Sequence, residues 1–335
     1  MTTNLSTVQL GKTGPAVSRL ALGAMGMSGM YGTADDAVSI ATVHAALDSG
    51  ANLIDTGDFY GMGHNELLIR QALADRKRED ITLSVKYGAL RGPDNSFGGV
   101  DTRPAATKNF LAYSLQRLGT DYVDIYRPAR LDPNIPIEET IGGLAELVQA
   151  GYIRHIGLSE VGAETLRRAA AVHPIVDLQI EYSLVSRGIE AEILPVAREL
   201  GIGITAYGVL SRGLLSDSLR PGQQFAPSDF RAHSPRFQGE NLDANLRLVD
   251  ALAKIAAEHQ VSVAQLAIAW VLSRGTDIVP LIGARKPGRW AEAVTAVDIR
   301  LSDAELATIE AAVPAEQVAG GRYAPAQMAM LDSER

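Results

Sequence analysis

Residues 52–66 read NLIDTGDFYGMGHNE, which is a short apolar run followed by an acid and a glycine-rich loop. The run at residues 52–54 predicts a buried strand that ends just before Asp55. Upstream, Ala37–Ser49 has the pattern of a helix, and Gly50 stands in the usual position of a helix-ending glycine. A helix followed at once by a buried strand is typical of a parallel α/β sheet.

The same alternation of apolar runs and amphipathic stretches extends along the chain. Further helices are predicted at residues 105–118, 137–150 and 189–200, and a glycine closes each of them. Eight strands in this alternation predict an α/β fold of the (β/α)8 TIM barrel type. The predicted strands cover residues 19–22, 52–54, 81–85, 122–126, 153–158, 176–180, 202–206 and 278–282.

Two segments lie outside this alternation. Residues 8–18 contain two short apolar runs around a Gly/Pro turn, which predicts an N-terminal β-hairpin before the barrel. Residues 215–239 are rich in Pro, Ser, Gly and Arg, which predicts a long loop after strand seven. Such loops commonly shape the active-site rim of a barrel, although a tolerated surface insertion would have the same composition. Since no linker-like segment divides the chain, we expect a single domain over residues 1–335.

The composition is that of a globular protein, because 46% of the 335 residues are hydrophobic and 21% are charged. The absence of cysteine excludes disulfide scaffolds, and the six histidines do not have metal-ligand spacing, so no metal site is expected. A net charge of −8, with no basic run longer than residues 76–78, argues against binding to nucleic acid or to a membrane. Residues 1–8 do not resemble a secretion signal, and we expect a cytoplasmic protein.

Three side chains with complementary chemistry follow two neighbouring strands. Asp55 ends one strand, Tyr60 lies in the loop after it, and Lys86 ends the next strand. Catalytic groups of barrel enzymes lie at these carboxyl ends, so the three side chains are expected to converge. A nearby ammonium would lower the pKa of the phenol, and a carboxylate would hold the lysine in place. The set predicts an acid–base site, with a buried ion pair beside a packed tyrosine as the alternative.

Residues 55–66 also resemble a family signature. Their sequence, DTGDFYGMGHNE, is similar to D-T-A-x-x-Y-G-x-G-x-N-E, the pattern of the aldo-keto reductases, and the resemblance covers nearly the whole chain. It implies a (β/α)8 barrel that binds NADPH without a Rossmann fold and reduces a small aldehyde or ketone substrate to an alcohol. It also implies that Tyr60 is the general acid and that Lys86 and Asp55 tune it.

The resemblance further implies which residues hold NADPH or NADP+. Ser159, Glu160 and Gln179 match positions that hold the nicotinamide amide, and Tyr207 matches the residue that stacks on the nicotinamide ring. A second group matches the segments that bind the pyrophosphate and the adenosine phosphate. Arg285, Lys286 and Arg289 in that group suit a 2′-phosphate and favour NADPH over NADH. The group consists of Leu210, Arg212, Gly283, Arg285, Lys286, Arg289 and Glu292.

One catalytic position departs from the family pattern. The family carries a histidine in the segment Y-x-x-H-R-x-D-P, whereas residues 126–133 read YRPARLDP, so that Ala129 replaces it. Loss of such a donor costs about 2.7–4 kcal/mol of transition-state stabilisation, by analogy with an oxyanion hole. Pyridoxal reductases of the family carry a similar A-R-x-D-P segment, which favours a pyridoxal-like aldehyde, and the small side chain leaves room for a bulky cyclic ketone. The alternative is an NADPH-binding regulatory or sensor protein with vestigial turnover.

Overall fold

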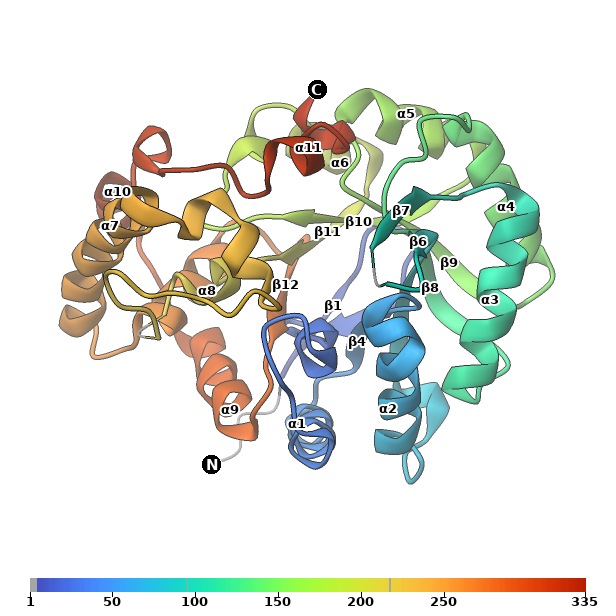
Figure 1. Ribbon diagram of the computed structural model, residues 1–335, viewed down its shortest axis with the longest axis horizontal. Helices are drawn as coiled ribbons and strands as arrows, with labels where there is room; N and C mark the ends of the chain where they lie inside the picture. The colour runs from blue at the N-terminus through green and yellow to red at the C-terminus, as the bar shows by residue number, and fades with distance from the viewer. Residues whose placement is uncertain (1–4, 95, 217) are drawn as a thin grey trace.

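The computed structural model describes residues 5–94, 96–216 and 218–335. At its centre is a closed barrel of eight parallel strands surrounded by helices (Figure 1). Each predicted strand overlaps one strand of this barrel, so the predicted (β/α)8 fold is confirmed. In their order around the barrel, the strands are β3 (Ala21–Gly23), β4 (Leu53–Gly57), β5 (Thr82–Tyr87), β8 (Val123–Pro128), β9 (Ile153–Ser159), β10 (Ile175–Glu181), β11 (Gly203–Tyr207) and β12 (Ile278–Gly283).

Most of the helices connect two strands and cover the outside of the barrel, and the last three follow β12 (Figure 1). They are α1 (Asp36–Asp48), α2 (His64–Ala72), α3 (Pro104–Leu118), α4 (Ile137–Gln149), α5 (Ala163–Val172), α6 (Ile193–Leu200), α7 (Gly239–Glu258), α8 (Val263–Ser273), α9 (Pro287–Thr295), α10 (Asp303–Ala312) and α11 (Pro325–Met328). The four predicted helices correspond to α1, α3, α4 and α6. The last begins at Ile193 rather than Ile189, because Gly188–Glu190 forms a separate 3₁₀ turn.

We also asked whether any helix in the part of the chain that the structure describes could span a membrane. No single helix there is long and apolar enough to span a bilayer, although α7 and α8, which are bent by 86° against each other, pass the test together. The beginning of the chain, on which the cytoplasmic expectation partly rests, lies outside the described residues. The interpretation of residues 1–335 as one domain stays a prediction.

The predicted N-terminal hairpin closes one end of the barrel. Strands β1 (Thr7–Gln9) and β2 (Ala16–Ser18) pair antiparallel, and Leu10 and Val17 are buried in a cluster with side chains of the barrel strands. Gly11 in the turn has a φ of 62°, and a Cβ atom there would lie 2.2 Å from the carbonyl oxygen of Val176. Only glycine therefore lets this turn approach the barrel backbone so closely. The hairpin leaves the opposite end of the barrel uncovered, and this is the end where the parallel strands have their carboxyl termini and where a functional site is expected.

Three segments surround that opposite end. One is an antiparallel hairpin that the sequence did not predict, formed by β6 (Ala89–Arg91) and β7 (Phe97–Val100) after strand β5. The second is the predicted long loop between β11 and α7, where the backbone N–H of Phe230 donates to the carbonyl of Met30 in the loop after β3 (3.1 Å). The third is the C-terminal segment, which returns from α10 across the molecule to α11 (Figure 1).

A charged pair lies inside the barrel itself. Arg127 of β8 donates through Nη1 to Oδ2 of Asp177 on β10 (2.9 Å) and through Nη2 to the hydroxyl of Ser84 (2.8 Å). Both charged side chains are completely buried. Buried charges require such partners, since an unpaired charge in the interior is strongly unfavourable. The hydroxyl of Ser84 in turn donates to Oδ2 of Asp55 (2.8 Å), so the polar interior continues into the site above it.

Candidate active site

Asp55, Lys86 and Gln179 form a closed hydrogen-bonded set at the carboxyl ends of β4, β5 and β10. Lys86 Nζ forms an ion pair with Oδ1 of Asp55 and donates to Oε1 of Gln179 (2.7 Å). The amide of Gln179 donates to Oδ2 of Asp55 (2.8 Å). All three side chains are buried. The lysine is therefore fixed in position by two side chains that come from different strands.

Tyr60 lies directly beside this set. It opens the turn Tyr60–Gly63 after β4, and its ring centroid is 5.3 Å from Nζ of Lys86. The turn needs left-handed backbone at Gly63, where φ is 92° and a Cβ atom would lie 2.8 Å from Cδ of Arg117. The glycine-rich sequence thus allows the chain to turn back and bury the phenol, which is 5% exposed. The structure brings together the three residues that the sequence predicts for acid–base chemistry.

The pKa values of these groups differ from the expectation. Burial raises the pKa of Tyr60 well above its ordinary value of 10, and the negative charge of Asp55 adds to this effect. The expected lowering of the phenol pKa by an ammonium was therefore wrong, because desolvation dominates at a site this closed. Burial also lowers the pKa of Lys86 to about 8, against the opposing effect of Asp55. Tyr60 is consequently protonated at neutral pH, as a proton donor must be.

A second buried acid, Asp58, makes stability depend on pH. Burial raises its pKa from 3.8 to about 7, and the carboxylate of Glu66 adds to the effect. Since the folded state holds this proton more tightly than the unfolded chain, stability falls as the pH rises from about 4 to about 7. We expect Asp58→Asn to remove this dependence, so that the melting temperatures of wild type and variant diverge across that window. Parallel melting curves at all pH values would contradict the prediction.

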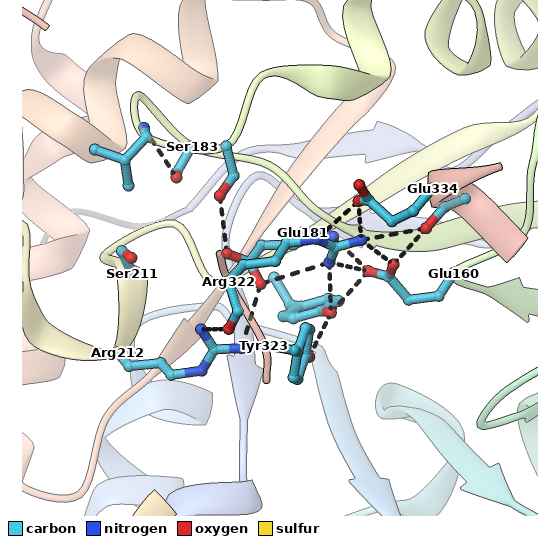
Figure 2. Close-up of polar contacts among 12 residues, drawn as sticks. Glu160, Glu181, Ser183, Ser211, Arg212, Arg322, Tyr323 and Glu334 are labelled. Atoms are coloured by element: carbon cyan, nitrogen blue, oxygen red, sulfur yellow. Dashed lines mark hydrogen bonds and ion pairs between the residues drawn. The ribbon is translucent and has the colours of Figure 1, made fainter. Parts of the chain in front are cut away.

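A further charged network lies at the mouth of the barrel, which is the end where the strands have their carboxyl termini (Figure 2). Some of its residues were not predicted from the sequence. Glu160 follows β9, and its carboxylate accepts hydrogen bonds from Arg322 (2.5 and 2.9 Å) and from the hydroxyl of Tyr207 (2.7 Å). Burial opposes ionisation of Glu160, but the guanidinium of Arg322 outweighs it and holds the pKa at about 2. The buried Arg322–Glu160 ion pair ties the C-terminal segment to the barrel, and Arg322 also pairs with the exposed Glu334 within that segment.

Glu181 and Tyr323 belong to the same network. Glu181 ends β10 and accepts from Nη2 of Arg212 (3.3 Å), whose guanidinium carbon lies 4.7 Å from the ring centroid of Tyr323. The hydroxyls of Tyr323 and Tyr207 are 2.8 Å apart. The only sequence signal for the C-terminal members is an Arg-Tyr pair after two glycines, which has no distinctive spacing. The structure reveals them because it joins positions that are 162 residues apart.

These contacts show what the predicted nicotinamide residues do in the structure. Ser159, Glu160, Gln179 and Tyr207 all lie at the mouth, at or just beyond the ends of β9, β10 and β11. Gln179 accepts a hydrogen bond from Lys86, and Glu160 pairs with Arg322. Tyr207 is half-buried. Their contacts with a nicotinamide stay predictions.

The predicted phosphate-binding residues divide between two places. Leu210 and Arg212 lie in the loop after β11. The guanidinium of Arg212 donates hydrogen bonds to the carboxylate of Glu181 and to the carbonyl of Arg322 (3.1 Å). The others gather around the N-terminus of α9. Gly283 and Lys286 are exposed there, Arg285 donates to the carbonyl of Tyr31 (2.9 Å), and Arg289 pairs with Glu292 (2.9 Å).

The N-terminus of α9 is suited to a phosphate. A helix N-terminus carries positive potential, and Lys286 and Arg289, the latter paired with Glu292, add two exposed cations. A Cβ atom added at Gly283 or Gly288 would meet nothing within 4 Å, so the approach is open. The residues present therefore fit the phosphorylated end of a nicotinamide cofactor.

Ala129 directly follows β8 and offers no side-chain donor at the mouth. It is 3% exposed, and its backbone N–H donates to the carbonyl of Tyr87 (2.8 Å). Within the described ranges, no group of three or more His, Cys, Asp or Glu side chains is arranged to hold a metal ion. The polar groups described at the mouth include phenols, an ammonium, an amide, carboxylates and guanidinium groups.

Comparison with known proteins shows the family to which this chain belongs. The sequence model of the Aldo/keto reductase family matches residues 19–314. Probable aldo-keto reductase 1 from Glycine max is 42% identical over 319 residues, which cover 94% of this chain and 91% of that protein.

Two solved structures are similar along nearly the whole chain. The glycerol dehydrogenase AKR11B4 from Gluconobacter oxydans is 33% identical with a TM-score of 0.85, covering 96% of this chain and 98% of its own. The aldo-keto reductase AKR11C1 from Bacillus halodurans, in its holo form, is 27% identical with a TM-score of 0.77, covering 93% and 97%. The chain therefore belongs to the aldo/keto reductase family, whose chemistry is nicotinamide-dependent carbonyl reduction.

Proposed function

We propose that this protein is an NADPH-dependent reductase of aldehydes or ketones in which Tyr60 donates the proton to the carbonyl oxygen. The observation that carries the proposal is the buried set of Asp55, Lys86 and Gln179 beside the phenol of Tyr60. A phenol kept protonated at neutral pH, next to a cation that stabilises the phenolate left behind, is a suitable general acid.

Each of these residues has a distinct part in the proton transfer. The cofactor, when bound, supplies a hydride to the carbonyl carbon. Tyr60 gives its proton to the oxygen, where negative charge develops. Lys86 stabilises the phenolate that forms, because burial makes a charge at this distance effective. Asp55 and Gln179 hold Nζ of Lys86 in place, and the carboxylate of Asp55 compensates its charge, so the site is preorganised.

The α9 N-terminus supports the choice of NADPH over NADH. A 2′-phosphate placed there would contact Lys286 and Arg289, and charge-assisted hydrogen bonds are about twice as strong as neutral ones. We expect the double variant Lys286→Gln/Arg289→Gln to raise the KM for NADPH by about 10-fold or more and to change that for NADH little. Arg300→Gln, which removes another exposed cation, is the control and should change neither value. Equal weakening toward both cofactors would contradict the assignment.

Ala129 supports two classes of substrate, pyridoxal-like aldehydes and bulky cyclic ketones. The small side chain adds room at the mouth, and the segment around it is similar to that of pyridoxal reductases. The test is steady-state NADPH oxidation with a panel of pyridoxal, simple aldehydes, and open-chain and cyclic ketones. A kcat/KM for pyridoxal or cyclic ketones well above that for simple aldehydes is expected. Equal values across the panel would remove the substrate proposal and leave the reductase proposal intact.

The same position favours one alternative, a regulatory or sensor protein that binds NADPH with vestigial turnover. Tight NADPH binding without multiple turnover on any carbonyl of the panel would establish that alternative. Multiple turnovers with alcohol formation would exclude it. The location that we propose for either activity is the cytoplasm, with a small carbonyl or alcohol compound as the partner.

A further inference from the structure

Arg130 places a guanidinium at the mouth of the barrel. It directly follows Ala129, the residue that stands where the family has a histidine. Its Nη1 donates to the carbonyl of Ala129 (2.6 Å), and its Nη2 donates to the hydroxyl of Tyr323 (3.4 Å). The group is half-buried. A guanidinium carries five N–H donors and no acceptor. Over residues 5–94, 96–216 and 218–335, these are its hydrogen bonds, so the remaining N–H donors are available to a ligand.

The direction of the neighbouring hydrogen bonds decides which group can donate to a substrate. Glu160 is ionised and can only accept, so the hydroxyl of Tyr207 donates its proton to Glu160. The oxygen of Tyr207 then accepts the proton of Tyr323, and the oxygen of Tyr323 accepts from Arg130. The protons of both phenols are committed within this chain. Of the donors in this series of hydrogen bonds, Arg130 is the one that keeps N–H groups for a ligand.

Arg130 lies within electrostatic reach of both reacting side chains. Burial is the largest influence on the pKa values of Tyr60 and Lys86, and the charge of Arg130 acts on both of them as well. Burial disfavours the charge of Arg130 itself, but Tyr323, Tyr207 and Glu160 outweigh it and raise its pKa, so it stays a cation. A permanent cation whose charge acts on the proton donor is suited to stabilising negative charge on a carbonyl oxygen.

The C-terminal segment holds this guanidinium in place. Arg322 is fixed by Glu160 and Glu334 (Figure 2). The neighbouring ring of Tyr323 packs edge-on against Phe230 with centroids 6.0 Å apart. Tyr323 also lies against Arg212. Because its ring is held from several sides, its hydroxyl is a fixed acceptor for Nη2 of Arg130.

From this geometry we propose that Arg130 replaces the missing histidine as the hydrogen-bond donor to the substrate oxygen, and that Tyr323 is its positioning residue. The inference rests on the proposed reductase function. Arg130 donates a hydrogen bond and keeps its proton throughout, while Tyr60 remains the group that loses one. The developing negative charge on the oxygen is then shared between a phenol and a guanidinium, in place of a phenol and an imidazole.

The test is single-turnover reduction at saturating NADPH. We expect Arg130→Met to lower the reduction rate by about 10²-fold, the effect of losing one oxyanion donor. NADPH affinity and the melting temperature should change little. Adding Ala129→His to this variant should recover at least about 10-fold of the rate, because it restores a donor at the family position. Arg168→Met, which removes an exposed arginine on α5, is the matched control and should react like wild type.

Tyr323 is tested by a double-variant cycle. Tyr323→Phe should lower the rate less than Arg130→Met does, and the double variant should be no slower than Arg130→Met alone, since Tyr323 acts through Arg130. If the fold-loss of rate in the double variant equals the product of the two single-variant losses, the two residues act independently, and Tyr323 is not a positioning residue for Arg130.

Benzoate provides a second readout that does not depend on turnover. A guanidinium with free donors binds a carboxylate, so Arg130→Met should weaken benzoate binding to the NADPH-loaded protein by about 10-fold or more, whereas Arg168→Met should not. Wild-type reduction rates and wild-type benzoate affinity in Arg130→Met would overturn the inference. Tyr60→Phe, measured in the same experiment, separates this inference from the proposed function. If Tyr60→Phe abolishes reduction while Arg130→Met does not change it, only the role of Arg130 is wrong. If Tyr60→Phe is fully active, the proposed function itself is wrong.

Discussion

Tyr60→Phe is expected to lower kcat for carbonyl reduction by about 10²–10⁴-fold, the usual contribution of a general acid. The change removes one oxygen from a buried ring and leaves the packing against Phe59 and Lys86 in place. Tyr207 and Tyr323 do not substitute for Tyr60, because their protons are committed to hydrogen bonds. The measurement is steady-state NADPH oxidation with the best carbonyl substrate of the panel.

The control for this variant is Tyr113→Phe, at a tyrosine that is 59% exposed on α3. It should have wild-type kcat, and both variants should bind NADPH as wild type does. A Tyr60→Phe protein with unchanged kcat would show that the proton comes from elsewhere. A variant that loses NADPH affinity together with activity would instead report damage to the cofactor site.

Asp177→Leu is expected to destabilise the protein by about 3–5 kcal/mol, because it leaves Arg127 charged and unpaired inside the barrel. Arg127 would keep its bond to Ser84, but a neutral hydroxyl cannot compensate a buried cation. The measurement is the free energy of unfolding in urea at neutral pH. The effect should be visible as a large fall in the denaturation midpoint with a nearly constant slope.

The matched control is the double variant Arg127→Met/Asp177→Leu. Apolar replacement of both partners removes the unpaired charge, so its stability should be well above that of Asp177→Leu and close to wild type. If the double variant were the less stable of the two, the pair would contribute through packing or through Ser84 rather than through compensation of charge. A loss below about 1 kcal/mol in Asp177→Leu would contradict the buried-charge argument.

The barrel could be predicted from sequence because its signals are local. Apolar runs and helix-ending glycines such as Gly50 and Gly119 repeat with the regularity of βα units. Helix α2 was missed because it begins with His64-Asn65-Glu66, polar residues that the signature already accounted for. The β6–β7 hairpin was missed because its strands are short and half-exposed, and only their pairing defines them.

The site was predictable where the residues follow strand ends and unpredictable where it depends on distant packing. Asp55 and Lys86 could be placed together because parallel strands end at one face of a barrel. The raised pKa of Tyr60 was missed because the extent of burial is set by the fold and not by the nearest charge. The Glu160–Arg322 pair was missed because no local pattern links β9 to the C-terminal segment.

The most direct test of the central claim is a count of alcohol molecules formed per protein molecule, with NADPH in excess and the carbonyl panel as substrates. The account predicts many turnovers, with one alcohol formed for each NADPH consumed, and their loss in Tyr60→Phe. Bound NADPH with no more than one alcohol formed per protein molecule on any substrate would contradict it.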